Sequence, residues 1–139
     1  MTAVRGVSPR LLGAYRRTTY RAGDASVRIG RRSPVMDALL ARQHARCAVF
    51  VTAWNPFSRR MPEGWNRRMQ QRLVERLRRR TVLPASGAAG RWHEDHVLVL
   101  AALPWTMRLA RVYRQNAVVT VRPGGRARLH LTGRTATGG

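Results

Sequence analysis

Three short segments are apolar at successive positions, and they constrain the fold more than any other feature of the sequence. They cover residues 47–51, 97–100 and 117–121. Successive side chains of a strand point to opposite faces of its sheet. A strand that is apolar on both sides is therefore stable only where both faces of the sheet are covered. The sequence predicts a sheet with three interior strands and with helices on both faces.

Four helices are predicted around these strands. Two begin with a serine cap followed by proline, at Ser8-Pro9 and at Ser33-Pro34. Apolar residues at helical spacing predict a third helix over 63–80 and a fourth over 105–115. The inward-facing residues of these last two helices are expected to be Trp65, Met69, Leu73 and Leu77, and then Trp105, Leu109, Val112 and Tyr113.

Weaker signals predict further strands at 27–29, 81–83 and 127–131, and a loop of small residues at 86–90. From residue 47 onward the order is strand, helix, strand, strand, helix, strand, which is the order of the ferredoxin-like split βαβ motif. The predicted fold class is α/β (α+β), a ferredoxin-like mixed sheet with extra N-terminal helices and a C-terminal edge hairpin. We expect one domain over 1–131 and a disordered tail over 132–139.

Uncommon polar residues follow or precede the interior strands, at the edge of the sheet where the predicted topology brings them together. The candidate ligand-binding residues are Trp54, Asn55, Asn66, Glu94, Gln115 and Asn116. Carboxamides and one carboxylate suit hydrogen-bonded recognition of a polar ligand, such as a nucleobase or a peptide group. The alternative interpretation is that these side chains organise turns and loops, as amides often do.

The same residues carry a resemblance to a known family. Thr52-Ala53-Trp54-Asn55-Pro56, followed by Asn66, Glu94 and Gln115-Asn116-Ala117, resembles the signature of the bacterial family known as domain of unknown function 3293. The resemblance extends from about Tyr15 to Leu131. It implies a single-domain bacterial protein whose characteristic polar residues are those of the candidate cluster, and it implies no activity.

Motifs for catalysis, metals and cofactors are weak. Glu94 and His96 are the titratable candidates near the cluster, and no set of nucleophile, base and orienting group accompanies them. The run 93–96 holds four potential metal ligands at a spacing unlike that of zinc motifs, so no metal site is expected. The segment 87–90 lacks the lysine and hydroxyl residue of a phosphate-binding loop, and no cofactor is expected.

The cellular location is inferred from what the sequence lacks. The longest apolar run, 97–103, is far shorter than the ~20 residues of a membrane-spanning helix, and the N-terminus resembles no signal peptide. The single cysteine, Cys47, is interpreted as a buried structural thiol. These observations predict a cytoplasmic protein without a membrane partner.

Charge suggests a partner. The formal net charge is +21, from 27 basic and 6 acidic residues, and every basic residue is arginine. The absence of lysine indicates that codon bias, as much as function, explains the high arginine content. The outward arcs of the two long helices are nevertheless basic, and a continuous positive face there would bind phosphate backbones, with RNA favoured over DNA. The candidate nucleic-acid-binding residues are Arg67, Arg68, Arg72, Arg78, Arg79, Arg108 and Arg111.

Two functional hypotheses remain. The preferred hypothesis is a non-enzymatic binding module for nucleic acid, RNA in particular, or for another polyanion. The alternative is a small enzyme or a polar-ligand-binding domain that uses the amide and glutamate cluster.

Overall fold

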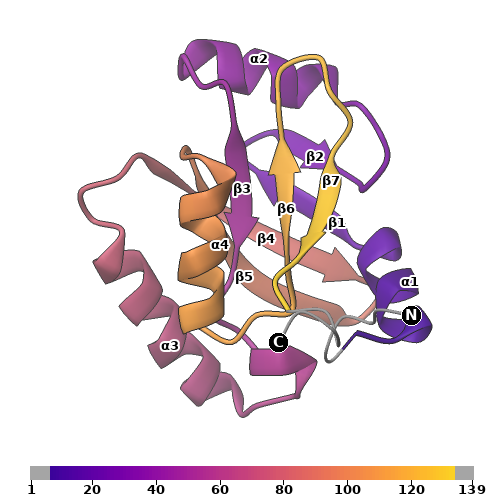
Figure 1. Ribbon diagram of the computed structural model, residues 1–139, viewed down its shortest axis with the longest axis vertical. Coiled ribbons are helices and arrows are strands. Elements are labelled where there is room, and N and C mark those ends of the chain that lie inside the picture. The colour runs from indigo at the N-terminus through magenta and orange to yellow at the C-terminus, as the bar shows by residue number, and fades with distance from the viewer. Residues whose placement is uncertain (1–6, 134–139) are drawn as a thin grey trace.

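The computed structural model describes residues 7–133, which form four α-helices, one short 3-10 helix and seven strands (Figure 1). The elements in chain order are α1 (Pro9–Arg17), β1 (Thr19–Ala22), β2 (Ala25–Val27), α2 (Pro34–Arg42), β3 (Ala48–Val51), η1 (Pro56–Ser58), α3 (Glu63–Arg76), β4 (Val82–Ala89), β5 (Trp92–Val99), α4 (Leu103–Val112), β6 (Ala117–Val121) and β7 (Arg128–Leu131). The α/β class is confirmed.

The seven strands form one curled sheet in the order β2-β1-β4-β5-β3-β6-β7. The relative order β4-β5-β3-β6 is the one expected for the middle of the chain. The expected mixed sheet is wrong, because each ladder between strands is antiparallel. In residues 7–133, parallel pairing is confined to one isolated bridge, between Ile29 and Ala127, which brings the two ends of the curled sheet together.

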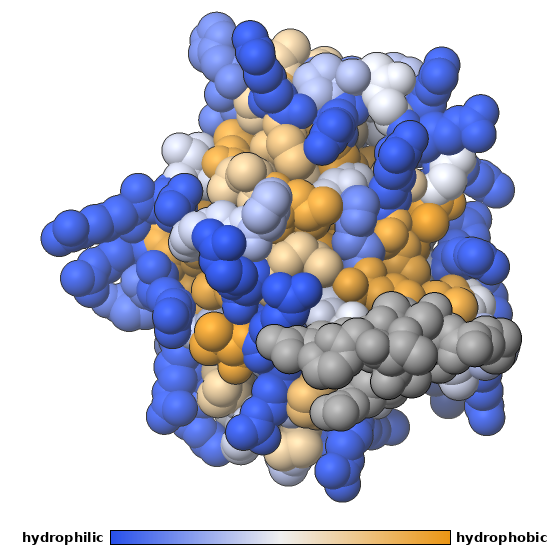
Figure 2. Space-filling model, viewed as in Figure 1, coloured by the Kyte–Doolittle hydropathy of each residue, from blue (hydrophilic) through white to orange (hydrophobic). Residues whose placement is uncertain are grey.

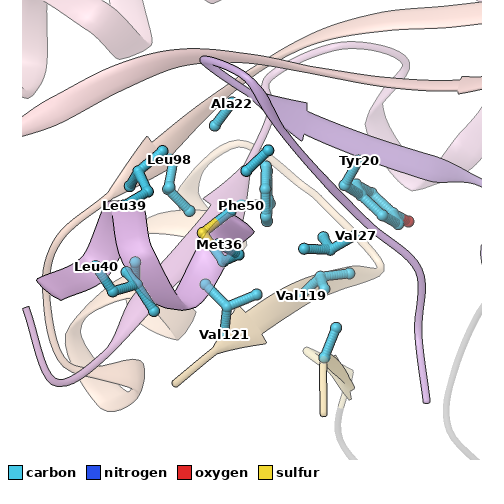
Figure 3. Packing of buried hydrophobic residues seen from close by; sticks show 13 residues of the cluster. Tyr20, Ala22, Val27, Met36, Leu39, Leu40, Phe50, Leu98, Val119 and Val121 are labelled. Atoms are coloured by element: carbon cyan, nitrogen blue, oxygen red, sulfur yellow. The ribbon is translucent and has the colours of Figure 1, made fainter. Parts of the chain in front are cut away.

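Each face of the sheet carries its own apolar core, as the three interior strands require. On one face, α3 and α4 pack over Val49, Val51 and Val99. On the other face, α2 packs over Phe50 and Leu98. Figure 3 shows Met36, Leu39 and Leu40 of α2 pointing towards these strands. Because a strand alternates its side chains, a single run of apolar residues supplies both cores.

Both serine caps are present. The hydroxyl of Ser8 accepts the backbone N–H of Leu11, and that of Ser33 accepts the backbone N–H of Met36, each at 3.2 Å. The helix predicted over 63–80 is shorter than expected: it ends at Arg76, and Leu77 caps it. Val112 is 55% exposed, so its predicted inward position is wrong, whereas Leu109 is buried as expected.

The loop predicted at 86–90 is wrong, because these residues belong to a long hairpin. β4 runs to Ala89, Gly90 turns the chain with a φ of 57°, and β5 starts at Trp92. Small residues are poor strand formers, but here they make room: a Cβ at Gly87 would lie 2.9 Å from Cε1 of His96. The bulk of His96 on the neighbouring strand thus explains why position 87 is a glycine.

Strand β1 is absent from the sequence-based prediction, which placed a single strand at 27–29. Tyr20 pairs with Val27 and Ala22 with Ala25, across a turn at Gly23-Asp24. A two-residue glycine turn between alternating residues is a hairpin signal, so the sequence does contain the information for this pair of strands.

Two further expectations concern the C-terminal tail and the side chain of Cys47. Thr132, placed in the predicted tail, is buried and its N–H donates to the backbone oxygen of Asn116 at 2.9 Å; residues 134–139 of that tail lie outside the described part. Cys47 is half-buried against the α3 and α4 core. Between residues 7 and 133, no helix combines the length and apolar character needed to cross a membrane.

Candidate functional site

A cavity of about 980 Å³ opens beneath α1, on the face of the sheet that carries Tyr20 and Phe50. Helix α1 forms one wall, from Ser8 to Thr18, and six strands contribute to the rest. Volumes of this size hold small organic ligands. Small residues of β4, Gly87 and Ala89, line the cavity together with the larger side chains of Tyr20, Phe50 and Trp92.

Asn55 holds the polar end of this cavity. It follows β3 and adopts a left-handed conformation, with φ 47° and ψ 66°. Its side-chain nitrogen donates to Oε2 of Glu94 at 2.8 Å. Its side-chain oxygen accepts the amide nitrogen of Asn66 and the backbone N–H of Met61, both at 2.9 Å. Asn66 in turn accepts the backbone N–H of Asn55 at 2.9 Å. Each of these bonds restrains Asn55, so its amide is presented to Glu94 in one orientation.

Within the described part of the chain, Glu94 is the one carboxyl group that lines the cavity. Burial raises the pKa of Glu94 from 4.5 to about 7, and the donors Asn55 and Trp92 limit that rise. A carboxyl group with this pKa exists in both protonation states near neutral pH. It is able to accept or to donate a hydrogen bond, or to transfer a proton.

His96 lies two residues further along β5, on the same face of the strand. Its ring packs edge-on against Tyr20 with centroids 5.7 Å apart. Burial lowers the pKa of His96 to about 4, so the ring is neutral at physiological pH. Burial also raises the pKa of the Tyr20 phenol, which therefore stays protonated.

The segment after β3 contains unusual backbone conformations. Asn55, Phe57 and Ser58 all have positive φ, between 47° and 60°. Ser58 lines the cavity, and its hydroxyl accepts the side-chain amide of Asn116 at 2.9 Å and lies 3.4 Å from the hydroxyl of Tyr15. Left-handed conformations are unfavourable for residues with a side chain. Three of them beside a cavity mark a segment whose position is fixed by its surroundings.

The structure brings the six predicted ligand-binding residues into one connected region, but divides their roles. Asn55, Glu94 and Gln115 line the cavity. Asn66 and Asn116 lie behind it and bond to Asn55 and Ser58. Trp54 is buried, edge-on to His93 at 6.3 Å, and is not among the lining residues.

Gln115 illustrates the organising role. Its side-chain nitrogen donates to the backbone oxygens of Trp54 at 3.0 Å and of Tyr113 at 3.1 Å. Its amide thereby joins the end of α4 to the segment after β3. The side chains of Gln115, Asn66 and Asn116 therefore organise turns and loops, which is the alternative interpretation drawn from the sequence.

Several cavity residues were not identified from the sequence: Tyr15, Tyr20, Ser58 and Arg28. Tyr15 comes from α1, Tyr20 from the unpredicted strand β1, Arg28 from the residue after β2 and Ser58 from η1, so their proximity depends on the curl of the sheet. A cap-defined helix followed by a glycine hairpin is the signal that would have placed Tyr15 and Tyr20 near each other.

The seven candidate nucleic-acid-binding arginines are all exposed. A groove along α3 is lined by Arg67, Arg68, Arg72, Arg78 and Arg79, and by Arg76. Arg108 and Arg111 of α4 do not line it, and Nε of Arg111 donates to the backbone oxygen of Thr132 at 2.9 Å. Figure 2 shows hydrophilic side chains projecting on all sides of the visible face, with apolar patches between them.

Strand alternation separates the four potential metal ligands of segment 93–96. His93 and Asp95 pair with each other on the exposed side, at 3.1 Å, while Glu94 and His96 face the cavity. Within the described chain, no group of three or more His, Cys, Asp or Glu side chains is placed to hold a metal ion.

Fold and site together define a class: an α/β domain in which buried carboxamides fix one glutamate at the wall of a cavity. Residues 51–118 match the sequence model of a family described as "Protein of unknown function (DUF3293)". The predicted membership of that family is therefore confirmed over this segment, which runs from the end of β3 into β6 and contains all six candidate ligand-binding residues. Comparisons with curated proteins and with solved structures found no match.

Proposed function

We propose that the protein binds a small polar ligand in the cavity beneath α1, with Glu94 as its main hydrogen-bonding group. The observation that carries this proposal is the support of Glu94 by Asn55, which is itself held by Asn66 and by the backbone of Met61. Two successive layers of hydrogen bonds that orient one group at a cavity wall are typical of a preorganised binding site.

The chemistry of the wall limits the ligand. Tyr20 and Phe50 offer aromatic surface, with centroids 5.6 Å apart, and Glu94 offers a carboxyl group whose pKa is close to 7. A flat polar group with a donor and an acceptor side by side, such as a nucleobase or an amide, matches both properties. The neutral ring of His96 adds a second hydrogen-bonding group on the same face.

A panel of neutral nucleosides and capped dipeptides tests the proposal, with the side-chain amide resonance of Asn55 as the NMR readout. Binding is expected to move this resonance in a saturable way and to weaken about tenfold in Glu94→Gln, because a neutral amide replaces a carboxyl group that is able to accept a charge-assisted hydrogen bond or to donate one. Glu75→Gln, an exposed glutamate on α3, is the matched control. No shift with any member of the panel, or equal weakening by both substitutions, would contradict the proposal.

A second candidate function, binding of RNA or another polyanion, is supported by the groove along α3. Six arginines line it together with Glu75 and Asp95 as the carboxylates. Two of the six are already paired, Arg67 with Glu63 at 2.9 Å and Arg78 with Glu75 at 3.0 Å. These exposed pairs are weak, so phosphates are able to compete for the arginines.

Filter binding of single-stranded RNA over a range of salt concentrations tests this second function. The double substitution Arg68→Gln and Arg79→Gln is expected to weaken binding and to reduce its salt dependence by about two charges. The double substitution Arg32→Gln and Arg46→Gln removes the same charge elsewhere and is the control. If both doubles weaken retention equally, the charge acts without a defined surface.

The order β4-β5-β3-β6 also supports a ferredoxin-like classification of the middle of the chain. In this classification β1, β2 and β7 are additions at the two edges. The additions matter for function, because β1 and β7 contribute Tyr20 and Leu129 to the cavity.

A further inference from the structure

Three arginines share the wall of the cavity with Glu94: Arg10 and Arg17 on α1, and Arg28 after β2. Among residues 7–133, none of the three forms an ion pair with a carboxylate. Glu94, the one lining carboxyl group, is only partly ionised at neutral pH. The wall therefore carries an excess of positive charge that the side chains of residues 7–133 leave unbalanced.

Arg28 is the most restricted of the three. Its Nε is buried and has no hydrogen-bond partner among the described residues. Its Nη2 donates to the backbone oxygen of Arg16 at 3.4 Å, which is a long contact. A buried donor without an acceptor destabilises the folded chain. A guanidinium group presents its donors in a fork that fits the two oxygens of a carboxylate or a phosphate.

These arginines differ from the others in their placement. A chain with a net charge of +21 carries arginines over much of its surface, and most of them face solvent. Arg10 and Arg17 are exposed too, but together with the half-buried Arg28 they come from two separate segments and line one concave wall. At the half-buried Arg28, attraction for an anion is stronger and less screened by salt than on the open surface, and Arg10 and Arg17 add positive charge at the same wall.

We propose that the cavity takes a small organic anion, whose phosphate or carboxylate group binds Arg28 together with Arg10 and Arg17 while its polar remainder reaches Glu94. The inference rests on the proposed ligand-binding function and names the class of ligand. Phosphate and carboxylate share the oxyanion that a guanidinium recognises, and the experiment separates the two.

The test titrates the full chain with inorganic phosphate and, separately, with acetate, at constant ionic strength set with chloride. Saturable NMR shifts are expected at the backbone amides of Arg28, Ala89 and Gly90. Arg28→Gln is expected to weaken binding about tenfold. Arg46→Gln removes the same charge from an exposed position outside the cavity and is expected to change binding less than twofold. Tighter binding of phosphate than of acetate assigns a phosphorylated ligand, and the reverse assigns a carboxylate.

The outcomes separate this inference from the function on which it rests. Glu94→Gln is expected to keep or tighten phosphate binding, because it removes an opposing negative charge, while its binding of the neutral probes weakens about tenfold. Neutral probes that bind without saturable phosphate or acetate binding would overturn the anion site and leave the ligand-binding function standing. Equal weakening by Arg28→Gln and Arg46→Gln would also overturn it. If Arg28→Gln does not fold, Arg17→Gln at the exposed end of α1 takes its place.

Discussion

Helices α1 and α2 are alike in sequence design and different in packing. Both have nine residues, and both begin with a serine cap followed by proline. Helix α2 buries Met36, Leu39 and Leu40 against the sheet, whereas α1 buries no residue. A cap determines where a helix starts. The difference shows that a cap does not determine what a helix packs against: α2 covers an apolar core, whereas α1 covers a cavity.

The largest expected effect separates these two helices directly. Leu40→Ala removes a fully buried side chain from the core under α2 and is expected to lower the free energy of unfolding by about 2–5 kcal/mol. Leu11→Ala removes a half-buried side chain from the cavity wall on α1, and its effect is expected to stay below about 1 kcal/mol. Urea denaturation of both variants measures the difference. Equal losses would mean that α1 contributes to the core as much as α2 does.

The second prediction concerns pH, because Glu94 and His96 both face the cavity side of the sheet. Burial raises the pKa of Glu94 from 4.5 to about 7. As the pH rises through this window, the unfolded chain releases the proton while the folded chain retains it, so stability falls. Glu94→Gln removes this loss. Relative to the wild type, it is expected to gain stability between pH 4.5 and 7, on the order of 3 kcal/mol once complete.

His96 makes the folding stability change with pH in the opposite direction. Burial lowers the pKa of His96 from 6.5 to about 4, so the unfolded chain takes up a proton first and stability falls as the pH drops through that window. The two slopes oppose each other in the wild type. In Glu94→Gln the slope of His96 remains, and stability is expected to rise from pH 4 to 6.5. Thermal unfolding at a series of pH values measures this, with Glu75→Gln as a control that should follow the wild type.

A pair of glycine substitutions gives smaller effects of opposite sign. Gly87→Ala places a Cβ 2.9 Å from Cε1 of His96, whose buried ring has little room to move. It is expected to lower the free energy of unfolding by about 1–3 kcal/mol. Combining it with His96→Ala removes the close contact, so the two substitutions together should cost less than the sum of the singles. Additive losses would indicate that the contact is not the cause.

Gly13→Ala is the counterpart on α1. The nearest atom to its Cβ is a terminal nitrogen of Arg17, at 3.1 Å, and that flexible side chain is able to move away. Alanine is a better helix former than glycine, so a gain of about 0.5–1 kcal/mol is expected. A stability loss here would show that α1 is held more tightly against the cavity than its lack of buried residues implies.

Local sequence patterns predicted the buried apolar strands better than the strand of small residues, β4. The two-faced apolar segments located β3, the end of β5 and β6, because burial on both sides leaves a clear pattern. The long hairpin of β4 and β5 was missed, since Ala85 to Ala89 are small and resemble a loop. Their strand conformation depends on partners across the ladder, such as His96 opposite Ala85, and a propensity scale does not contain this information.

The candidate site, like the fold, was predicted only in part. Asn55, Asn66 and Glu94 were placed together from strand order alone, and the hydrogen bonds between them agree with that placement. A small polar pocket at the sheet edge was predicted, but its extension under α1 was not, because that depends on the curl of the sheet and on α1 crossing above it. Tyr15 and Glu94 are 79 positions apart in the chain and meet only through that geometry.

The isolated bridge between Ile29 and Ala127 has a consequence for the behaviour of the protein at high concentration. Outer strands of open sheets offer unpaired backbone groups to which other chains add. Here the N–H of Gly30 donates to the oxygen of Ala127 at 2.8 Å, and the N–H of Ala127 donates to the oxygen of Arg31 at 3.0 Å. The two outermost strands thus partly satisfy each other through their flanking residues. The chain guards against intermolecular strand addition by its own curvature, in addition to the repulsion between its charges.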